Sequence, residues 1–264
     1  MVSNPSEIPF LKMMFAEAAP YVDQIVVTEF DRTHSGLPRD FIFSSHEQEF
    51  KAEFSQLVYL QGTNLDGVIL AAETPDEHHH NETLMRGWFA KQLRFRSNDV
   101  IISTDADEVL YDETYQWLRS NFNRTTKGYR FRLHQFFYRP NFLWIDKEFI
   151  APVALRYGAF SSTYPNNWRY QGAKLPGFWG VHFSWCMPVD EMVKKVKNYA
   201  HAAEHRHLSA REIFLSAREE KVFPFDDRDF RLSQISLDSP ILPQSFFKYS
   251  RTLDPDVFPP GSKK

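Results

Sequence analysis

Three acidic side chains that directly follow a short apolar run are the residues of this sequence best suited to chemistry. Asp105, Asp107 and Glu108 come after the run at residues 100–102. Residues two apart in extended backbone project to the same side, so Asp105 and Asp107 would present their oxygens together. Hard oxygen donors of this kind suit Mg²⁺ or Mn²⁺, cations that also bind diphosphates. The pattern predicts a metal-assisted site, although a solvated acidic turn would give the same short pattern.

Sequence patterns for other common chemistries are missing. The chain contains no Gly-x-Ser-x-Gly, no Gly-x-x-x-x-Gly-Lys, no Gly-x-Gly-x-x-Gly and no His-Glu-x-x-His. The single cysteine, Cys186, excludes an internal disulfide, and its Trp and Met neighbours predict a buried, inert thiol. Histidines at 201, 205 and 207 form only a weak zinc pattern. A carboxylate site at the end of a strand is the candidate that remains.

Length and composition favour a soluble α/β protein. The chain has 264 residues, of which 42% are hydrophobic and 25% charged, so we predict one large domain covering residues 1–264. Aromatic residues make up 16% of the chain, which suits a bulky core or a sugar-stacking cleft. A net charge of −3 without a basic block argues against a nucleic-acid partner.

The hydropathy of the chain gives no sign of a membrane protein. No apolar run approaches the ~20 residues that cross a bilayer. The first residues lack the basic and apolar regions of a signal peptide. We therefore expect a soluble, cytoplasmic protein, and the sequence does not indicate its oligomeric state.

The elements that must position the acids follow from hydrophobic periodicity. Because the run at 100–102 is continuous, we predict a strand buried on both faces of a mixed, mostly parallel central sheet that helices flank. Ligands bind beyond the carboxyl ends of such strands, where the acids stand. The predicted strands are residues 22–28, 57–60, 100–102, 128–138, 149–155 and 180–186. The predicted helices are residues 8–19, 84–93, 113–122, 188–203 and 209–220, the last with Ser209 as its N-cap.

Three further segments have no clear period. Residues 73–82, which contain the three consecutive histidines 78–80, are predicted to be a solvated loop. Residues 157–174 are predicted to form a long loop, which in a compact domain is more often a substrate cover than a plain connection. Residues 240–264 are rich in Pro and Ser and are predicted to be an extended or loose tail.

Several segments taken together resemble glycosyltransferase family 17, the family of the β-1,4-mannosyl-glycoprotein 4-β-N-acetylglucosaminyltransferases. The most specific part is the combination of Asp-Ala-Asp-Glu at 105–108 with His-x-Ser-Trp-Cys at 182–186. The resemblance covers roughly residues 8–220. Its segments are, in order, residues 22–29, 33–38, 98–108 and 180–186.

This resemblance implies a GT-A fold, which is a single Rossmann-like α/β unit. It also implies a divalent metal (Mn²⁺ or Mg²⁺), a UDP-sugar donor, a glycan hydroxyl as acceptor and inversion at the anomeric carbon. The sugar that the resemblance implies is N-acetylglucosamine, while xylose or another hexose remains an alternative donor sugar. The membrane anchor and stem of the eukaryotic members have no counterpart in this sequence, so the resemblance favours a bacterial or viral context.

The resemblance also implies roles for individual residues. The family's Asp-x-Asp falls on Asp105 and Asp107, so we expect Asp107 to bind the metal and Asp105 to contact the ribose or the metal and its water. His182 is a candidate third metal ligand or phosphate contact, with His201 as the fallback and a plain core histidine as the alternative. Glu29 and Arg86 match family positions and are candidates for donor binding, although Arg86 could equally be a surface arginine.

Inversion requires a general base that removes the proton of the acceptor hydroxyl. Asp190 and Glu191, in the first turn of the predicted helix 188–203, are our candidates, although acids there also suit the helix dipole. Tyr164, Trp168 and Trp179 are candidates for stacking on sugar, with Trp179 assigned to the donor site and core packing as the alternative.

Two other classes of function stay open. A glycoside hydrolase with two carboxylates would need neither metal nor nucleotide. An inactive carbohydrate-binding module would bind glycan without releasing UDP.

Overall fold

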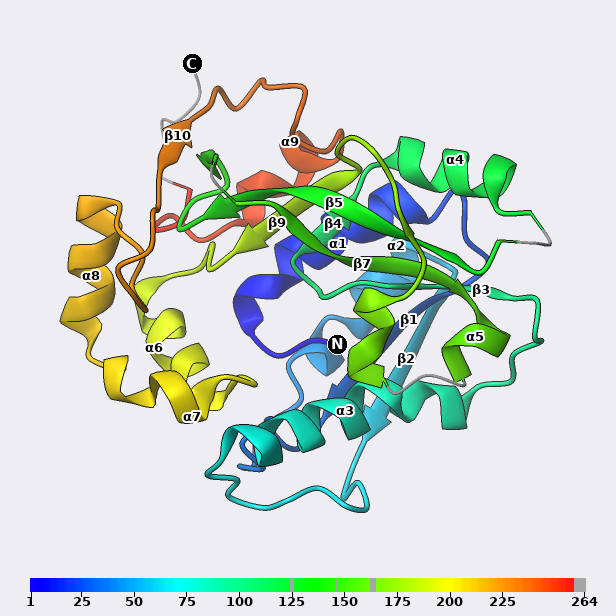
Figure 1. Cartoon of the computed structure of the whole chain (residues 1–264), viewed down its shortest axis with the longest axis horizontal. Helices are drawn as coiled ribbons and strands as arrows, with labels where there is room; N and C mark the ends of the chain where they lie inside the picture. The colour runs from blue at the N-terminus through cyan, green and yellow to red at the C-terminus, as the bar shows by residue number, and fades with distance from the viewer. Residues whose placement is uncertain (124–125, 146, 162–164, 259–264) are drawn as a thin grey trace.

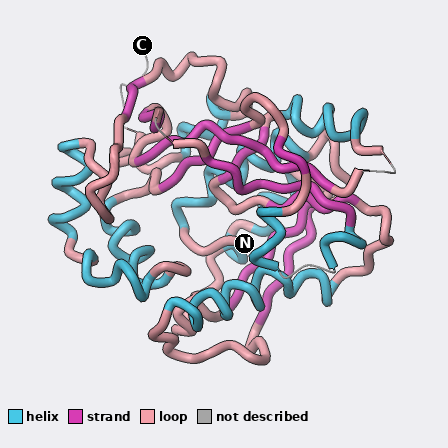
Figure 2. Tube along the Cα trace, viewed as in Figure 1, coloured by secondary structure: helices cyan, strands magenta, loops and turns pink. Residues whose placement is uncertain are grey.

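The strands form two separate sheets in the computed structural model, which describes residues 1–123, 126–145, 147–161 and 165–258 (Figure 1). Within these residues one sheet has two strands and the other has eight. Figure 2 shows helices lying around the strands. The predicted α/β class is confirmed.

The smaller sheet contains the parallel strands β1 (Ile25–Phe30) and β2 (Leu57–Gly62). Strand β1 has six residues, and the four consecutive residues from Val27 to Phe30 are all buried. Consecutive burial is expected of a strand that is covered on both faces. The short helix α2 (Glu47–Glu53) lies between the two strands in sequence. The predicted strand 22–28 is confirmed for residues 25–28, but the strand begins at Ile25 and continues to Phe30.

The larger sheet is mixed, so the prediction of a mostly parallel central sheet is wrong. The strand order is β10-β6-β5-β7-β3, and β9 joins it by pairing with β5 and β4. Only β8 and β9 run parallel to their neighbour β5, and the other pairings of this sheet are antiparallel. The strands are β3 (Val100–Ser103), β4 (Glu108–Leu110), β5 (Gly128–Phe137), β6 (Phe142–Trp144), β7 (Phe149–Arg156), β8 (Ala173–Lys174), β9 (Gly180–Ser184) and β10 (Leu232–Gln234).

Strand β3 differs most from its prediction. Among the described residues it pairs with β7 alone, in antiparallel register, and Val100 is 39% exposed. A three-residue apolar run does not distinguish a central strand from one at the end of a sheet, because its length and composition suit both. A cavity of about 760 Å³, lined by residues 22–28 and 98–104, separates β3 from β1. The two sheets therefore do not merge into the single central sheet that was predicted.

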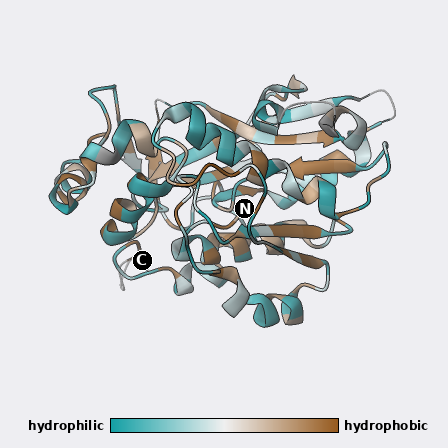
Figure 3. Cartoon of the chain, turned by 90° about the horizontal axis from the view of Figure 1, so that it is seen from below, coloured by the Kyte–Doolittle hydropathy of each residue, from teal (hydrophilic) through white to brown (hydrophobic). Residues whose placement is uncertain are grey.

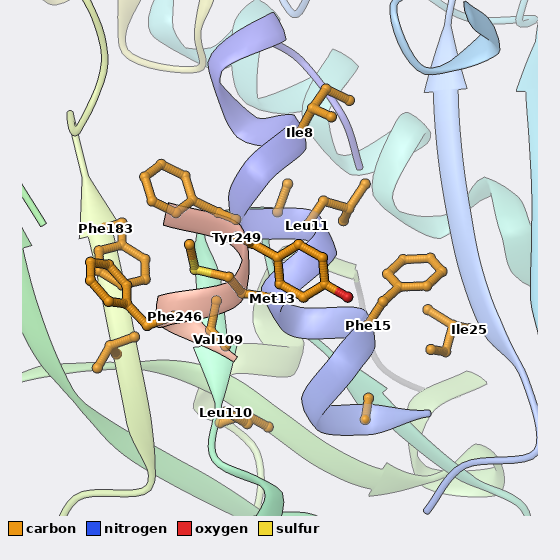
Figure 4. Close-up of a cluster of buried hydrophobic side chains, with 14 of the residues drawn as sticks. Ile8, Leu11, Met13, Phe15, Ile25, Val109, Leu110, Phe183, Phe246 and Tyr249 are labelled. Atoms are coloured by element: carbon orange, nitrogen blue, oxygen red, sulfur yellow. The ribbon is translucent and has the colours of Figure 1, made fainter. Parts of the chain in front are cut away.

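Helix α1 (Ile8–Ala18) is the centre of the main core, and it matches the predicted helix 8–19. Figure 4 shows its Met13 and Phe15 among side chains from β1, β4, β9 and the C-terminal segment. The ring of Phe10 stacks on Phe183 of β9 with 4.6 Å between centroids. In Figure 3 hydrophobic residues run along several strands, while the outer helices carry many hydrophilic ones.

The C-terminal segment belongs to this core, so the prediction of a loose tail is wrong for residues 240–258. Helix α9 (Phe246–Tyr249) lies against α1, and Leu242, Phe246, Leu253 and Val257 are buried. Apolar residues spaced by Pro and Ser were enough to pack onto an existing helix without a long regular element of their own. The remaining part of the predicted tail, residues 259–264, lies outside the described residues.

Helix α3 (Pro75–Gln92) replaces the loop predicted at residues 73–82. Its start is a capping box, in which the Thr74 side chain accepts a hydrogen bond from the Glu77 backbone and Glu77 reaches back to Thr74. Thr-Pro-x-Glu, with Pro at the first helical position, is a sequence signal for a helix start. The three histidines are therefore helical, and His78 is buried, with Nε2 3.0 Å from the Ala72 carbonyl oxygen.

The remaining helices follow the predictions more closely. α4 (Asp112–Asn121) corresponds to the predicted helix 113–122, and α8 (Arg211–Glu220) to 209–220, although Ala210, not Ser209, is its N-cap residue. The predicted helix 188–203 divides into α6 (Val189–Asn198) and α7 (Ala202–His205). Figure 1 shows α6, α7 and α8 gathered at one end of the molecule. Segment 157–174 contains α5 (Tyr157–Ser161), a 3₁₀ turn at Pro165–Tyr170, and β8, so it is only partly a loop.

Candidate functional site

The acidic residues lie in a tight turn between β3 and β4. The Glu108 backbone N–H donates to the Asp105 carbonyl, and the Asp105 N–H donates to Glu108 Oε2 at 2.8 Å. The turn is bound to β9 because the Phe183 N–H donates to the Asp107 carbonyl. This backbone is a turn rather than the extended chain we expected, and the two aspartates pair with different basic groups.

Asp105 is paired with two arginines. Arg86 of α3 donates to Asp105 Oδ1 at 3.0 Å, and Arg169 of the 3₁₀ turn donates to Oδ2. Burial would raise the pKa of Asp105, but Arg169 and Arg86 outweigh it and hold this pKa well below its ordinary value. Asp105 is therefore ionised throughout the neutral range.

Glu108 contacts the same Arg169 that pairs with Asp105, and Glu108 is almost completely buried. Arg169 Nη1 lies 3.3 Å from Glu108 Oε1, so one guanidinium bridges Glu108 and Asp105. Burial raises the pKa of Glu108, because taking a carboxylate out of water favours its neutral form. The same two acids raise the pKa of Arg169 against the effect of its own burial.

Asp107 has a separate pair of partners. His182 Nε2 lies 3.7 Å from Asp107 Oδ2, and Lys195 Nζ of α6 lies 3.8 Å from the same oxygen. The β4–β9 register, which places Glu108 opposite His182, brings the imidazole to this position. Burial would raise the pKa of Asp107, but His182 and Lys195 lower it below its ordinary value. The ring of Phe149 stacks on the imidazole with 4.0 Å between centroids.

A second acid holds Arg86 in place. Glu82, one helical turn before Arg86 on α3, accepts a hydrogen bond from it at 2.9 Å. Burial would raise the pKa of Glu82, but Arg86 and His34 lower it to about 2. Arg86 is therefore part of the site and not a free surface arginine.

The two candidates for the general base differ in exposure and in the basic residue that each contacts. The Asp190 side chain is 70% exposed and forms an ion pair with Arg211 of α8 at 2.7 Å. Glu191 is less exposed and pairs with Lys194 at 2.8 Å. Glu191 also precedes Lys195 by four residues, so the two share one face of α6. Of the two acids, Glu191 is on the helix face that reaches Asp107.

Glu29 is completely buried, away from solvent. Its carboxylate accepts hydrogen bonds from the backbone N–H groups of Ile42 and Phe43 and from the Tyr59 hydroxyl at 2.6 Å. Arg39 lies 3.7 Å away. These contacts attach the segment after β1 to the sheet, and a role for Glu29 in donor binding stays a prediction.

Of the described aromatic candidates, Trp168 is a core residue and Trp179 is partly buried against the core. Trp168 is buried and packs near Phe89 of α3. Trp179 packs against Trp117 of α4 and donates its Nε1–H to the Pro176 carbonyl at 2.8 Å. Trp179 precedes β9 at the end remote from the acidic turn, because Leu110, not Glu108, pairs with Gly180. Tyr164 lies outside the described residues.

The acids do not form a preassembled metal cage. Among the described residues no group of three or more His, Cys, Asp or Glu side chains is arranged to hold a metal ion. His201, the fallback ligand, hydrogen-bonds Glu204 at 3.1 Å and packs beside His79. Mg²⁺ commonly binds through one or two carboxylates plus substrate phosphates, so the oxygens of Asp105 and Asp107 still suit such a cation.

Two basic residues of the site had not been predicted. Lys195 lies in the predicted helix 188–203, and Arg169 lies in the segment predicted to be a loop. A lysine four residues after a candidate acid marks one helix face, which was a usable signal for Lys195. No local pattern pointed to Arg169, because its partners precede it by more than 60 residues.

Three comparisons with known proteins bear on the family of this chain. Searches of curated proteins and of solved structures each found no match. Within the described part of the chain, no helix has both the length and the apolar character needed to span a membrane. The sequence model of glycosyltransferase family 17 matches residues 1–217, which include the acidic turn, His182 and Lys195. This match covers most of the 264 residues, and the chain therefore belongs to glycosyltransferase family 17.

Proposed function

We propose that this glycosyltransferase moves a sugar from a UDP-sugar to a glycan hydroxyl, with a divalent cation and with inversion at the anomeric carbon. The observation that carries the proposal is the acidic turn, in which Asp105 and Asp107 meet Arg86, Arg169, His182 and Lys195. Closely spaced carboxylates and basic groups suit a metal–diphosphate, which needs oxygen ligands for the cation and cations for its phosphates.

Asp107 would bind the cation directly in this proposal, with Asp105 and His182 beside it. A bound Mn²⁺ or Mg²⁺ would supply Lewis-acid stabilisation of the charge that develops on the leaving UDP. Arg86 and Lys195 contribute fixed positive charge on the two sides of the turn. A GT-A-type arrangement, in which this turn follows a strand of an α/β unit, is part of the proposal and is supported by family membership.

Glu191 is the proposed general base, with Asp190 as the second candidate. Support comes from the position of Glu191 on the face of α6 that also carries Lys195. The base would accept the proton of the acceptor hydroxyl as that oxygen attacks the anomeric carbon in a single displacement. N-acetylglucosamine is the proposed sugar, because it is the sugar that the family resemblance implies.

A panel of nucleotide sugars tests this function. The purified protein is incubated with UDP- and GDP-sugars, with Mn²⁺, with Mg²⁺ or with a chelator, and its melting temperature is recorded. We expect stabilisation by UDP-N-acetylglucosamine that needs the metal, since a ligand that binds only the folded state raises the melting temperature. Equal shifts in melting temperature with and without the chelator would contradict the metal requirement. A shift with GDP-sugars alone would contradict the proposed UDP-sugar donor.

A further inference from the structure

We propose that Arg169 binds the diphosphate of the donor, and that it changes partner to do so, leaving Asp105 when a cation and a diphosphate enter the acidic turn. The inference rests on the proposed function and assigns a donor-binding role to a residue outside the Asp-x-Asp and His-x-Ser-Trp-Cys segments.

Two guanidinium groups share Asp105, and they are held differently. Arg86 is bound on its other side by Glu82 at 2.9 Å, and only 11% of its side chain is exposed. Arg169 contacts Asp105 and Glu108, and 24% of its side chain is exposed. Each arginine is thus held by two acids, but Arg86 is the more buried of the two. Arg169 keeps a solvent-facing side through which the end at Asp105 can reorient.

The backbone that carries Arg169 is anchored, so the movement is confined to the side chain. The neighbouring Trp168 is buried in a cluster with Val153 and Leu155 of β7. The 3₁₀ turn also packs against α3, where Asn166 donates to the carboxylate of Glu82 at 3.2 Å. An arginine side chain on this fixed turn can reach two positions beside Asp105 without any opening of the segment.

Charge explains why the partner would change. Asp105 already faces two guanidinium groups, and a divalent cation beside it adds two positive charges at short range. A cation alone is therefore opposed by Arg169. A diphosphate that arrives with the cation brings negative oxygens, and it replaces the carboxylate that Arg169 gives up.

The planar fork of arginine also suits this role. A guanidinium donates two parallel hydrogen bonds to phosphate oxygens, as it does to carboxylates, whereas a lysine ammonium acts as a point charge. Arg169 uses both ends of the fork in this structure, one toward Asp105 and one toward Glu108. The end that leaves Asp105 would donate to oxygens of the diphosphate, while the other end stays beside Glu108.

The proposal predicts effects of opposite sign in Arg169→Gln. Binding of Mn²⁺ alone, measured by electron paramagnetic resonance, should become several-fold tighter, since one of the two guanidinium charges that compete for Asp105 is gone while Arg86 remains. Binding of UDP or of inorganic pyrophosphate in the presence of Mn²⁺, measured by calorimetry, should weaken by about 10- to 100-fold, the range for hydrogen bonds to a charged group. Arg169→Lys should be intermediate for the diphosphates because it keeps the charge without the fork.

Arg228→Gln is the matched control, because Arg228 is an exposed arginine that pairs with Asp226 away from the acidic turn. It should leave both binding constants unchanged. Circular dichroism and melting temperature verify that each variant is folded, and Arg169→Lys provides the test if Arg169→Gln does not fold.

A merely structural role for Arg169 would weaken Mn²⁺ and diphosphate binding together, and that result would overturn the proposal. Unchanged diphosphate affinity in both Arg169 variants would overturn it as well. Pyrophosphate separates this failure from that of the proposed function, because it contains the diphosphate without the base. If the unaltered protein binds Mn²⁺–pyrophosphate but not UDP, the donor assignment fails alone, and if it binds neither, both proposals fail.

Discussion

His182 lies 3.7 Å from Asp107, with its Nε2 facing Oδ2 across the antiparallel pair β4–β9. The two residues are 75 positions apart in sequence, and the strand register brings them together. Lys195 approaches the same oxygen from α6. Asp107 is therefore the point where the acidic turn, β9 and α6 meet, and changes there should separate binding from folding.

Asp107→Ala should remove transfer and metal-dependent UDP binding while the fold is kept. We expect turnover to fall by about 10³-fold or more, because metal stabilisation of a leaving group is worth several kcal/mol. UDP release gives the rate and calorimetry gives the binding. Asp227→Ala, at an exposed surface position, is the control. Full turnover in Asp107→Ala would exclude this residue as the metal ligand.

The two candidate bases should differ when each carboxylate is replaced by its amide. Glu191→Gln should keep UDP binding and lose about 10²- to 10⁴-fold in kcat, the usual contribution of a general base. Asp190→Asn should remain near the unaltered rate, since the Asp190 side chain is exposed and paired with Arg211. Steady-state kinetics with UDP binding as a parallel measurement checks both. Normal turnover in both variants would place the base elsewhere.

Glu29→Ala should destabilise the fold. Its buried carboxylate accepts two backbone N–H groups and the Tyr59 hydroxyl, all of which would lose their partner. We expect a loss of about 3–5 kcal/mol in the free energy of unfolding, the range for breaking a buried charged network. Urea denaturation measures it, with exposed Glu212→Ala as control. A loss below about 1 kcal/mol would show that these hydrogen bonds are dispensable.

His34 should make stability depend on pH in the weakly acidic range. Burial lowers the pKa of His34 from 6.5 to about 4, so the unfolded chain binds the proton more readily than the folded one. The contribution of His34 to stability is full above pH 6.5 and is lost as the pH falls toward about 4. When the pH falls from 7 to 5, the free energy of unfolding should decrease by roughly 1–2 kcal/mol less in His34→Gln than in the unaltered protein. Urea denaturation at both pH values checks this, and an equal loss in the variant and the unaltered protein would contradict it.

The packed C-terminal segment gives a matched pair of substitutions. Phe246 is completely buried beside α1, whereas the next residue, Phe247, is 51% exposed. Phe246→Ala should lower the free energy of unfolding by about 3–5 kcal/mol, as for other buried phenylalanines, and Phe247→Ala should lower it by less than about 1 kcal/mol. Denaturant unfolding of both variants gives the two values. Equal, small effects would mean that the segment is loose in solution, as its composition had suggested.

Local patterns were reliable where a single segment decides its own structure. The helical spacing of residues 8–19 and the alternation of β5 predicted both elements, because burial of one face needs no knowledge of the partner. The capping box at Thr74 is an equally local signal for the start of a helix, and the prediction of a loop at 73–82 did not take it into account.

Pairing between distant segments could not be obtained in this way. The apolar run at 100–102 is compatible with a parallel, buried strand and with the antiparallel, partly exposed β3 that the structure contains. Its neighbour is β7, more than 45 residues later, and the choice depends on the loops and helices between them. Sheet direction is a property of the whole chain and not of the strand.

The sequence by itself determined the family, the three acids at 105–108 and the presence of His182, since all three are local strings of residues. Only the tertiary structure decided which charges meet: Arg169 with Asp105, and Lys195 with Asp107. The physical reason is that electrostatic interactions depend on distance in space and on burial, and neither quantity can be read from positions along a chain.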